Sequence, residues 1–142
     1  AMLPFCGYNM GDYWSHWFNM ADNVSNLPQV FRVNWFRKDS NGKFLWPGFG
    51  QNMRVLKWIA ERAQNSVDAV ETPIGYVPNY EDLSWNGLDF SAEQFATLMN
   101  IDADEWTAEC ASQQRYFQQF GDKTPAKIEA QRQLTLQRIN QS

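Results

Sequence analysis

The chain has 142 residues, of which 44% are hydrophobic and 20% are charged, and this is the size and composition of one globular domain with a core. Its net charge of −4 argues against nucleic acid as a partner, because nucleic-acid-binding domains are usually basic. No apolar run is long enough to span a membrane, and the first residues lack the basic start and the long apolar core of a signal peptide, so we expect a cytoplasmic protein without a membrane partner.

The elements predicted for residues 1–64 are two helices and one strand. The first residues, MLPFCGYN, are apolar and turn-like, which is typical of the interior of a longer protein. Residues 12–20 place four aromatic side chains on one helical face, with Asp12 as the cap. Residues 30–36 alternate in the manner of a half-buried strand. Residues 53–64 have helical spacing, and Asn52 lies where an N-cap belongs.

The rest of the chain is irregular at first and then helical. Residues 71–90 contain several Pro and Gly breakers, and the IGYV within them predicts a short strand. Three helices are predicted after it, at 91–99, 102–120 and 124–140. Their predicted caps are Ser91 (a capping box with Gln94), Asp102 (with Glu105) and Thr124. We therefore expect an α+β, mainly helical fold in a single segment, 1–142, with a strand and loop at 30–52 and a helical tail at 91–140.

The loop at 34–52 contains five aromatic residues, three glycines and a proline, and it fits no helical or strand period. One interpretation is that the rings are core, because a loop can fold over its own side chains, and the pattern alone favours this. The other interpretation is a surface for a flat ligand, because stacking on an aromatic ring contributes about 1–3 kcal/mol per base. Half of all Lys and Arg lie at 32–57, which is consistent with a local anion site.

Asn52 also has two interpretations. Asn is a leading N-cap residue, so its side chain can serve the helix that follows. Alternatively its amide, which is both a donor and an acceptor, forms a polar edge beside the rings together with the backbone of Gly50 and Gln51. Guanine requires such a mixture of acceptors and donors. No GxxxxGK[ST] phosphate-binding loop accompanies this edge.

Four segments, PFCGYNMGDYWSHW, VNWFRKDSNGKFLWPGFGQN, RVLKWI and ETPIGYVP, strongly resemble the C-terminal part of GTP-dependent phosphoenolpyruvate carboxykinase, in the same order. The resemblance covers nearly the whole chain and implies the C-terminal nucleotide-binding portion of that fold, about the last quarter of the enzyme. In this family oxaloacetate and GTP are converted to phosphoenolpyruvate, GDP and carbon dioxide, in gluconeogenesis. The resemblance thus implies GTP/GDP and Mn²⁺ or Mg²⁺ as cofactors, and the rest of the same enzyme as a partner.

The resemblance also implies roles for individual residues. The guanine contacts that it implies are Phe36, Phe44, Phe49, Gly50, Gln51 and Asn52. Gln51 replaces an acidic residue that is usual in the family, which matters little if the backbone makes the contact. Phe5 matches an aromatic residue near the substrate's carboxylate, although Cys6 stands where the family often has a second aromatic residue.

The chemistry of this family depends on parts that the sequence lacks. The phosphate-binding loop, the metal ligands and the substrate arginines lie upstream in the family, so we expect no catalytic residue and no metal ligand here, and no activity of this chain alone. The alternative function is a non-catalytic nucleotide- or protein-binding module in which the aromatic loop is the docking surface.

Overall fold

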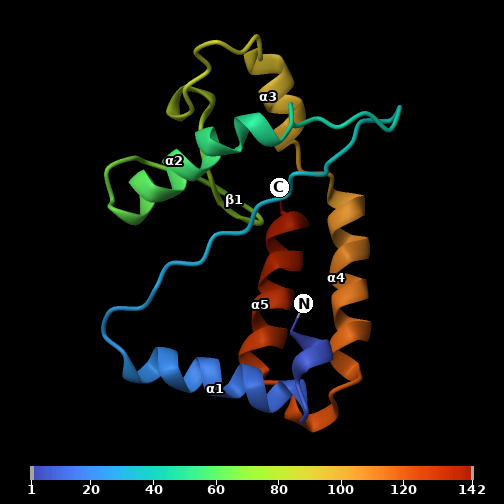
Figure 1. Ribbon diagram of the computed structural model, residues 1–142. Helices are drawn as coiled ribbons and strands as arrows, with labels where there is room; N and C mark the ends of the chain where they lie inside the picture. Colours follow the sequence, from blue (N-terminus) through green and yellow to red (C-terminus); the bar gives the residue numbers. More distant parts are fainter. Residues whose placement is uncertain (1, 142) are drawn as a thin grey trace. The chain divides into compact units, whose positions relative to one another are not determined.

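The computed structural model describes residues 2–141, which form two compact units (Figure 1). The hairpin unit contains the residues up to Pro28 and those from Asp102 onward, and the loop unit is Gln29–Ile101. Helices dominate residues 2–141, accompanied by a two-stranded sheet, so the expected α+β, mainly helical fold is confirmed. None of the helices in this range has the length and apolar character needed to cross a membrane. That both units belong to one segment of a larger domain stays a prediction.

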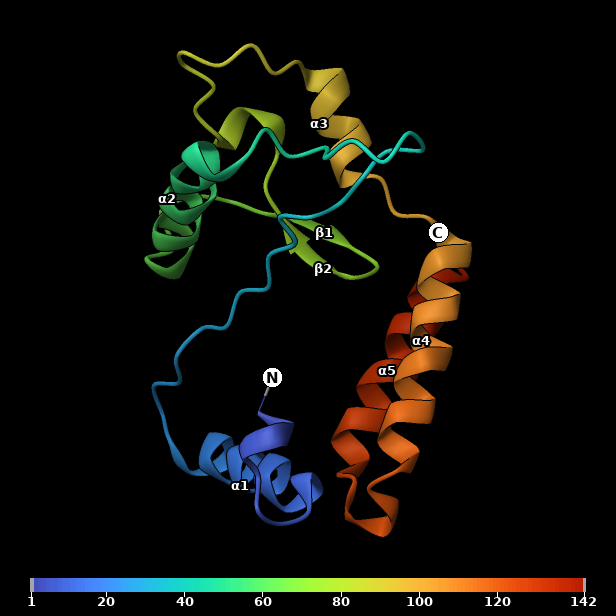
Figure 2. The same cartoon turned by 45° about the vertical axis from the view of Figure 1, so that its right-hand side comes forward.

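The hairpin unit is built on two long helices, α4 (Ala103–Gln118) and α5 (Ala126–Ile139), which run antiparallel and side by side (Figure 1, Figure 2). Helix α1 (Met10–Asn23) packs against the turn between them, where Gly121–Lys123 form a short 3-10 helix. A 3-10 turn, Leu3–Phe5, precedes α1. The unit is thus a three-helix arrangement closed at one end of the hairpin.

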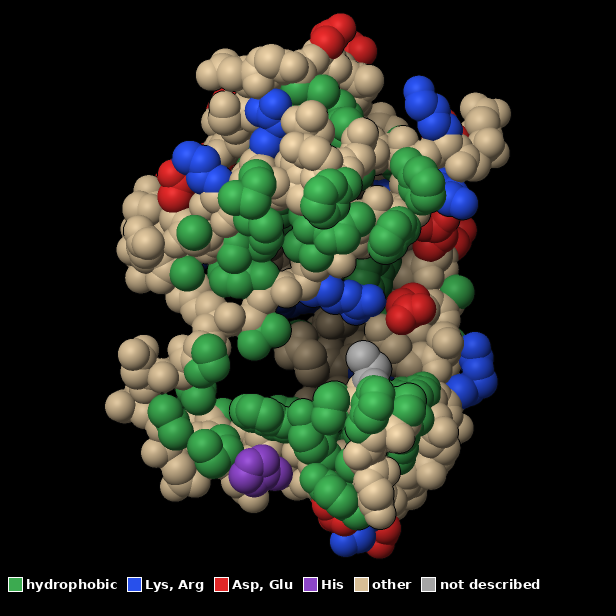
Figure 3. All heavy atoms as spheres, in the orientation of Figure 1, with side chains coloured by type: hydrophobic (Ala, Val, Ile, Leu, Met, Phe, Trp, Pro, Cys, Tyr) green, Lys and Arg blue, Asp and Glu red, His purple; other side chains and the backbone are tan. Residues whose placement is uncertain are grey.

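The loop unit contains α2 (Asn52–Ala63), the strands β1 (Val70–Thr72) and β2 (Gly75–Val77), and α3 (Ala92–Met99). The strands pair antiparallel, and β2 confirms the strand predicted from IGYV, whereas β1 was not predicted. Four buried residues form the core of this unit: Trp58, Leu83, Phe90 and Phe95. Hydrophobic side chains also reach the surface of the protein (Figure 3).

The caps of two helices were predicted correctly. Ser91 and Gln94 form the capping box of α3, in which each side chain accepts a hydrogen bond from the other residue's backbone N–H. Oδ1 of Asp102 accepts from the backbone N–H of Glu105 at 2.9 Å. These caps depend on residues three positions apart, which is why the sequence identifies them.

Two further predicted caps, Asp12 and Thr124, are wrong. Helix α1 begins before Asp12, and its cap is Asn9, whose side chain accepts from the backbone N–H of Gly11 at 2.8 Å. Helix α5 begins after Pro125, and the hydroxyl of Thr124 instead donates to the carbonyl of Phe117 at 3.0 Å. The side chain of Thr124 thus contacts the C-terminal end of α4 instead of capping α5.

The strand predicted at 30–36 is absent, because these residues find no partner strand within residues 2–141. An alternating pattern defines two faces, but a strand also needs a neighbour for its backbone groups. Here Oδ1 of Asn34 accepts from the backbone N–H of Phe36 at 3.0 Å, a local bond that competes with strand pairing. Phe31 packs on Trp58 with 6.2 Å between ring centroids, so its end of the segment does contact the core.

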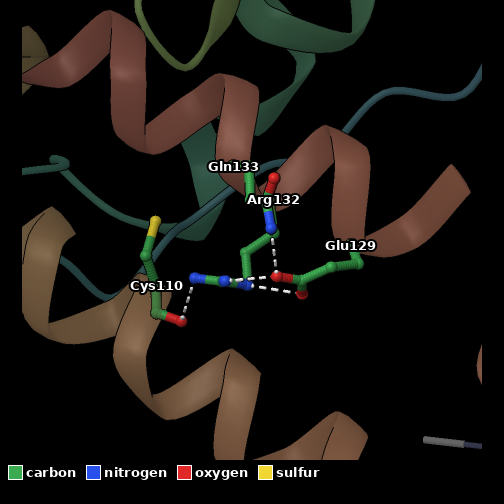
Figure 4. Close-up of polar contacts among 4 residues, drawn as sticks. All are labelled: Cys110, Glu129, Arg132 and Gln133. Atoms are coloured by element: carbon green, nitrogen blue, oxygen red, sulfur yellow. Dashed lines mark hydrogen bonds and ion pairs between the residues drawn. The ribbon is translucent and has the colours of Figure 1, made fainter. Parts of the chain in front are cut away.

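An ion pair within α5 holds Arg132, whose guanidinium also contacts α4 (Figure 4). Arg132 is 8% exposed, and its Nε donates to Oε2 of Glu129 at 2.8 Å, while another guanidinium nitrogen donates to the backbone carbonyl of Cys110 in α4 at 3.4 Å. The hydrogen bond from Arg132 lowers the pKa of Glu129 to about 2. The pair therefore satisfies the charge of Arg132 where α5 meets α4.

We predict that replacing Gly11 with Ala destabilises the docking of α1. A Cβ at Gly11 would lie 2.2 Å from the carbonyl oxygen of Lys123, which is backbone and cannot move as a side chain does. Overpacking of this kind costs about 1–3 kcal/mol, although Ala normally favours a helix over Gly. Denaturant unfolding measures the cost. Gly7→Ala is the control, since a Cβ there meets nothing within 4 Å, and equal effects of the two changes would contradict the packing.

We also predict an acid-sensitive contribution from Glu129. Its pKa in the folded chain lies below its ordinary value of 4.5, at about 2, so the contribution is present above about pH 4.5 and is lost as the pH falls towards 2. Because the Glu129 side chain is 37% exposed, we expect about 1 kcal/mol or less. The unfolding free energies of wild type and Glu129→Gln, compared from pH 7 to pH 2, should converge over this range. A difference that is independent of pH would contradict the prediction.

Candidate functional site

The aromatic loop is folded by a tight turn around Asp39. The carboxylate of Asp39 accepts from the backbone N–H groups of Asn41 and Lys43 at 2.8 and 2.9 Å, and its own backbone N–H donates to the carbonyl of Lys43. Gly42 has a φ of +79°, which favours glycine. The turn brings the segments on either side of it together, and Lys38 and Phe44 form an isolated bridge.

Three phenylalanines of this loop lie on the surface. Phe36 is 73% exposed, Phe44 is 50% exposed and Phe49 is 91% exposed. Phe36 and Phe44 contact each other with 6.2 Å between ring centroids, whereas no ring contact is described for Phe49 within residues 2–141. The interpretation of the loop rings as core is therefore wrong for these three, whereas Trp46 is 4% exposed and Trp35, which packs against it, is half-buried.

Three of the basic residues in and near the loop have partners within the protein. Arg37 donates to the carbonyl of Leu98 in α3 at 2.6 Å, and Lys57 pairs with Glu61 one turn further along α2. Nζ of Lys38 lies over the ring of Phe44, 4.9 Å from its centroid. A cation over the face of an aromatic ring is an attractive contact in its own right. These contacts weaken the interpretation of the basic segment as an anion site.

Asn52 is not an N-cap. It is the first residue of α2, and Gln51 occupies the cap position without a side-chain cap. Oδ1 of Asn52 accepts from the indole Nε1–H of the buried Trp46 at 2.8 Å. The helix-capping interpretation is wrong because a non-local donor takes this oxygen. A buried Trp usually finds an acceptor for its N–H. This tendency is the signal from which the sequence analysis could have included Trp46 among the site residues.

Arg54 fixes the side chain of Gln51, the residue before Asn52. Its Nε donates to Oε1 of Gln51 at 2.7 Å, and its guanidinium also donates to the carbonyls of Ser84 and Asn86, the latter at 2.9 Å. The side chain of Gln51 is thereby used within the protein. Its backbone N–H also has a partner, the carbonyl of Gly48 at 3.0 Å, so the backbone contact to guanine that the resemblance implies at this position stays a prediction.

The remaining predicted site residue, Phe5, lies in the hairpin unit and is 81% exposed. It ends the short 3-10 turn before α1. Across residues 2–141, no group of three or more His, Cys, Asp or Glu side chains could hold a metal ion. The described residues therefore offer rings and amide groups for a flat ligand but do not fit a divalent cation.

Comparison with known proteins identifies close relatives. The chain is 48% identical over 139 residues to a phosphoenolpyruvate carboxykinase (GTP) of Anaeromyxobacter dehalogenans, covering 98% of this chain and 23% of that protein. It is 47% identical to the proteins of the same name from Paenarthrobacter aurescens and Chlamydia trachomatis, covering 92% and 90% of this chain and 22% of each relative. The chain thus spans less than a quarter of the length of these relatives.

A family model described as the phosphoenolpyruvate carboxykinase C-terminal P-loop domain matches residues 1–138. The match confirms the resemblance found in the four sequence segments. The name of the family refers to a P-loop, yet the chain has no GxxxxGK[ST] motif. Because the match extends over nearly the whole chain, the chain belongs to the family of the phosphoenolpyruvate carboxykinase C-terminal P-loop domain.

Proposed function

We propose that this chain is the guanine-nucleotide-binding part of a GTP-dependent phosphoenolpyruvate carboxykinase, which converts oxaloacetate and GTP to phosphoenolpyruvate, GDP and carbon dioxide in gluconeogenesis in the cytoplasm. The observation that carries the proposal is the exposure of Phe36, Phe44 and Phe49 in a loop that leads into the polar segment 50–52. The relatives named as this enzyme favour the proposal over a non-catalytic docking module.

The three phenylalanines would supply the apolar part of the site. Phe36 and Phe44 meet edge to face at an interplanar angle of 62°, an arrangement that leaves ring surface open to solvent. A purine base placed against such rings removes apolar area from water on both partners. Rings carry few rotatable bonds, so their immobilisation costs little entropy. The exposed rings are thus suited to the base of GTP or GDP.

The segment 50–52 would supply the polar part. Asn52 presents an amide at the start of α2, and the backbone of Gly50 and Gln51 lies next to it. A Cβ built on Gly50 meets nothing within 4 Å, so space for a ligand remains beside this backbone. Hydrogen bonds of this kind determine which base is accepted, while stacking contributes affinity for any base.

The chain's role in the reaction would be to position the nucleotide. Phosphoryl transfer relies on positioning and on electrostatic stabilisation, and a base clamp holds the phosphates near the reacting groups. The divalent metal, Mn²⁺ or Mg²⁺, and the groups that bind phosphate would come from the remaining part of the enzyme. Phe5 would lie near oxaloacetate or phosphoenolpyruvate in that complete protein.

We predict that Phe49→Ala weakens binding of GDP by about 1–3 kcal/mol, the loss of one stacking partner. Because Phe49 is 91% exposed, the change should leave the melting temperature near that of wild type. Titration followed by tryptophan fluorescence measures binding, since Trp35 and Trp46 adjoin the loop. Tyr76→Ala removes an aromatic ring that is 62% exposed in the same unit and serves as the control. Equal GDP affinity in the two variants would argue against a site at Phe49.

We also predict that the 142-residue chain alone forms no phosphoenolpyruvate. It lacks the phosphate-binding motif, and residues 2–141 offer no metal-binding group. The assay supplies oxaloacetate, GTP and Mn²⁺ and measures phosphoenolpyruvate, with a complete carboxykinase as the positive control. Turnover above the protein-free background would show that the chain contains catalytic groups of its own.

A further inference from the structure

We propose that Trp46 is a positioning residue that orients the amide of Asn52 so that its NH₂ group faces the base. The oriented amide would make the surface selective for 6-oxo purines, such as guanine, over 6-amino purines, such as adenine. The inference rests on the proposed function, because it concerns the same base-binding surface. The inference adds Trp46 to the residues of the proposed site, as a residue that would not itself contact the base.

The orientation of the amide follows from the chemistry of the donor. An indole Nε1–H can only donate a hydrogen bond, so the Asn52 atom that lies 2.8 Å from it must be the oxygen. The amide nitrogen, Nδ2, therefore points away from Trp46. Without such a contact, the two ends of an Asn side chain are interchangeable by a half-turn of the amide.

Burial makes this orientation costly to reverse. Trp46 is 4% exposed, and its ring packs against Trp35 and Phe90 with 5.8 and 6.4 Å between centroids. A flipped amide would place its NH₂ against the indole N–H, and the buried donor would lose its acceptor. The packed indole thus holds Asn52 in one of its two orientations.

The free end of the amide is a donor. Among the hydrogen bonds described for residues 2–141, none uses Nδ2 of Asn52, and the residue is only partly buried. A donor matches the 6-oxo group of guanine or hypoxanthine, which accepts. It does not match the 6-amino group of adenine, because two NH₂ groups then face each other. The same contact cannot separate guanine from hypoxanthine, which differ at the 2-position.

The test is Trp46→Phe, which keeps an aromatic ring and removes the N–H. The amide of Asn52 is then free to turn and to offer its oxygen to adenine. We expect ADP to bind more tightly, so that the ratio of GDP to ADP affinity falls about fivefold to tenfold, the factor that corresponds to one hydrogen bond. The ratio of GDP to IDP affinity should stay unchanged. A gain in ADP affinity is a result that general damage to the loop would not produce.

Trp35→Phe is the matched control. It makes the same substitution in the ring that packs on Trp46, and no hydrogen bond from its indole is described within residues 2–141. This variant should keep the wild-type ratio of GDP to ADP affinity. A GDP to ADP ratio that falls equally in both variants, or that stays constant in Trp46→Phe, would overturn the inference.

A second measurement needs no mutation. In ¹⁵N NMR spectra of the wild-type chain, the side-chain NH₂ signals of Asn52 should shift on addition of GDP or IDP, and much less on addition of ADP. Absence of a shift with GDP, while GDP binds and Phe49→Ala weakens it, would overturn the role of the amide and leave the proposed function intact. If wild type binds no GDP at millimolar concentration, the proposed function fails, and this inference fails with it.

Discussion

The hydrogen bond from Trp46 to Asn52 connects the interior of the loop unit to the surface that we propose as its binding site. Its donor is buried and its acceptor begins α2, so the bond fixes the aromatic loop to a helix. A buried N–H without a partner would cost about 1–3 kcal/mol, which keeps the two groups together. Arg54 adds a second tie, from the start of α2 to the residues at 84–86. The end of the segment 46–52 is therefore held by Trp46 at Asn52 and by Arg54 at Gln51.

Exposure alone does not identify the site. Val30 is 92% exposed, as much as Phe49, and hydrophobic side chains reach the surface of the protein in several places (Figure 3). The chain spans only 23% of the length of its relatives, so apolar surface that packs against other parts of such an enzyme is expected. What sets Phe36, Phe44 and Phe49 apart in the proposed site is that their loop leads directly into the segment 50–52, where Trp46 holds Asn52 and Arg54 holds Gln51.

The sequence predicted the structure where the determining contacts are local, as at the caps of α3 and α4. It failed where the partner is missing, as for the strand at 30–36, or where a group that the pattern did not single out makes the contact, as Asn9 does in α1 and Trp46 does at Asn52. The alternation at 30–36 defined two faces but not a neighbouring strand, and Asn34 takes the backbone N–H of Phe36 instead. Asn52 looked like a cap because it immediately precedes the helix predicted at 53–64, but α2 begins at Asn52 itself and its oxygen accepts from Trp46. The exposure of the phenylalanines was not predictable, since an aromatic loop can equally fold over its own rings.

Two glycines near the polar edge illustrate the difference between a fold requirement and a site requirement. Gly48 has φ +121° and ψ 177°, a region essentially restricted to glycine, so the backbone that leads to Phe49 needs it. Gly50 is not among the residues with positive φ, and a Cβ there would touch nothing. Neither its conformation nor its packing calls for glycine. A glycine at this position is consistent with the proposed guanine contact, because a side chain would obstruct the approach of a ligand to the backbone at 50–52.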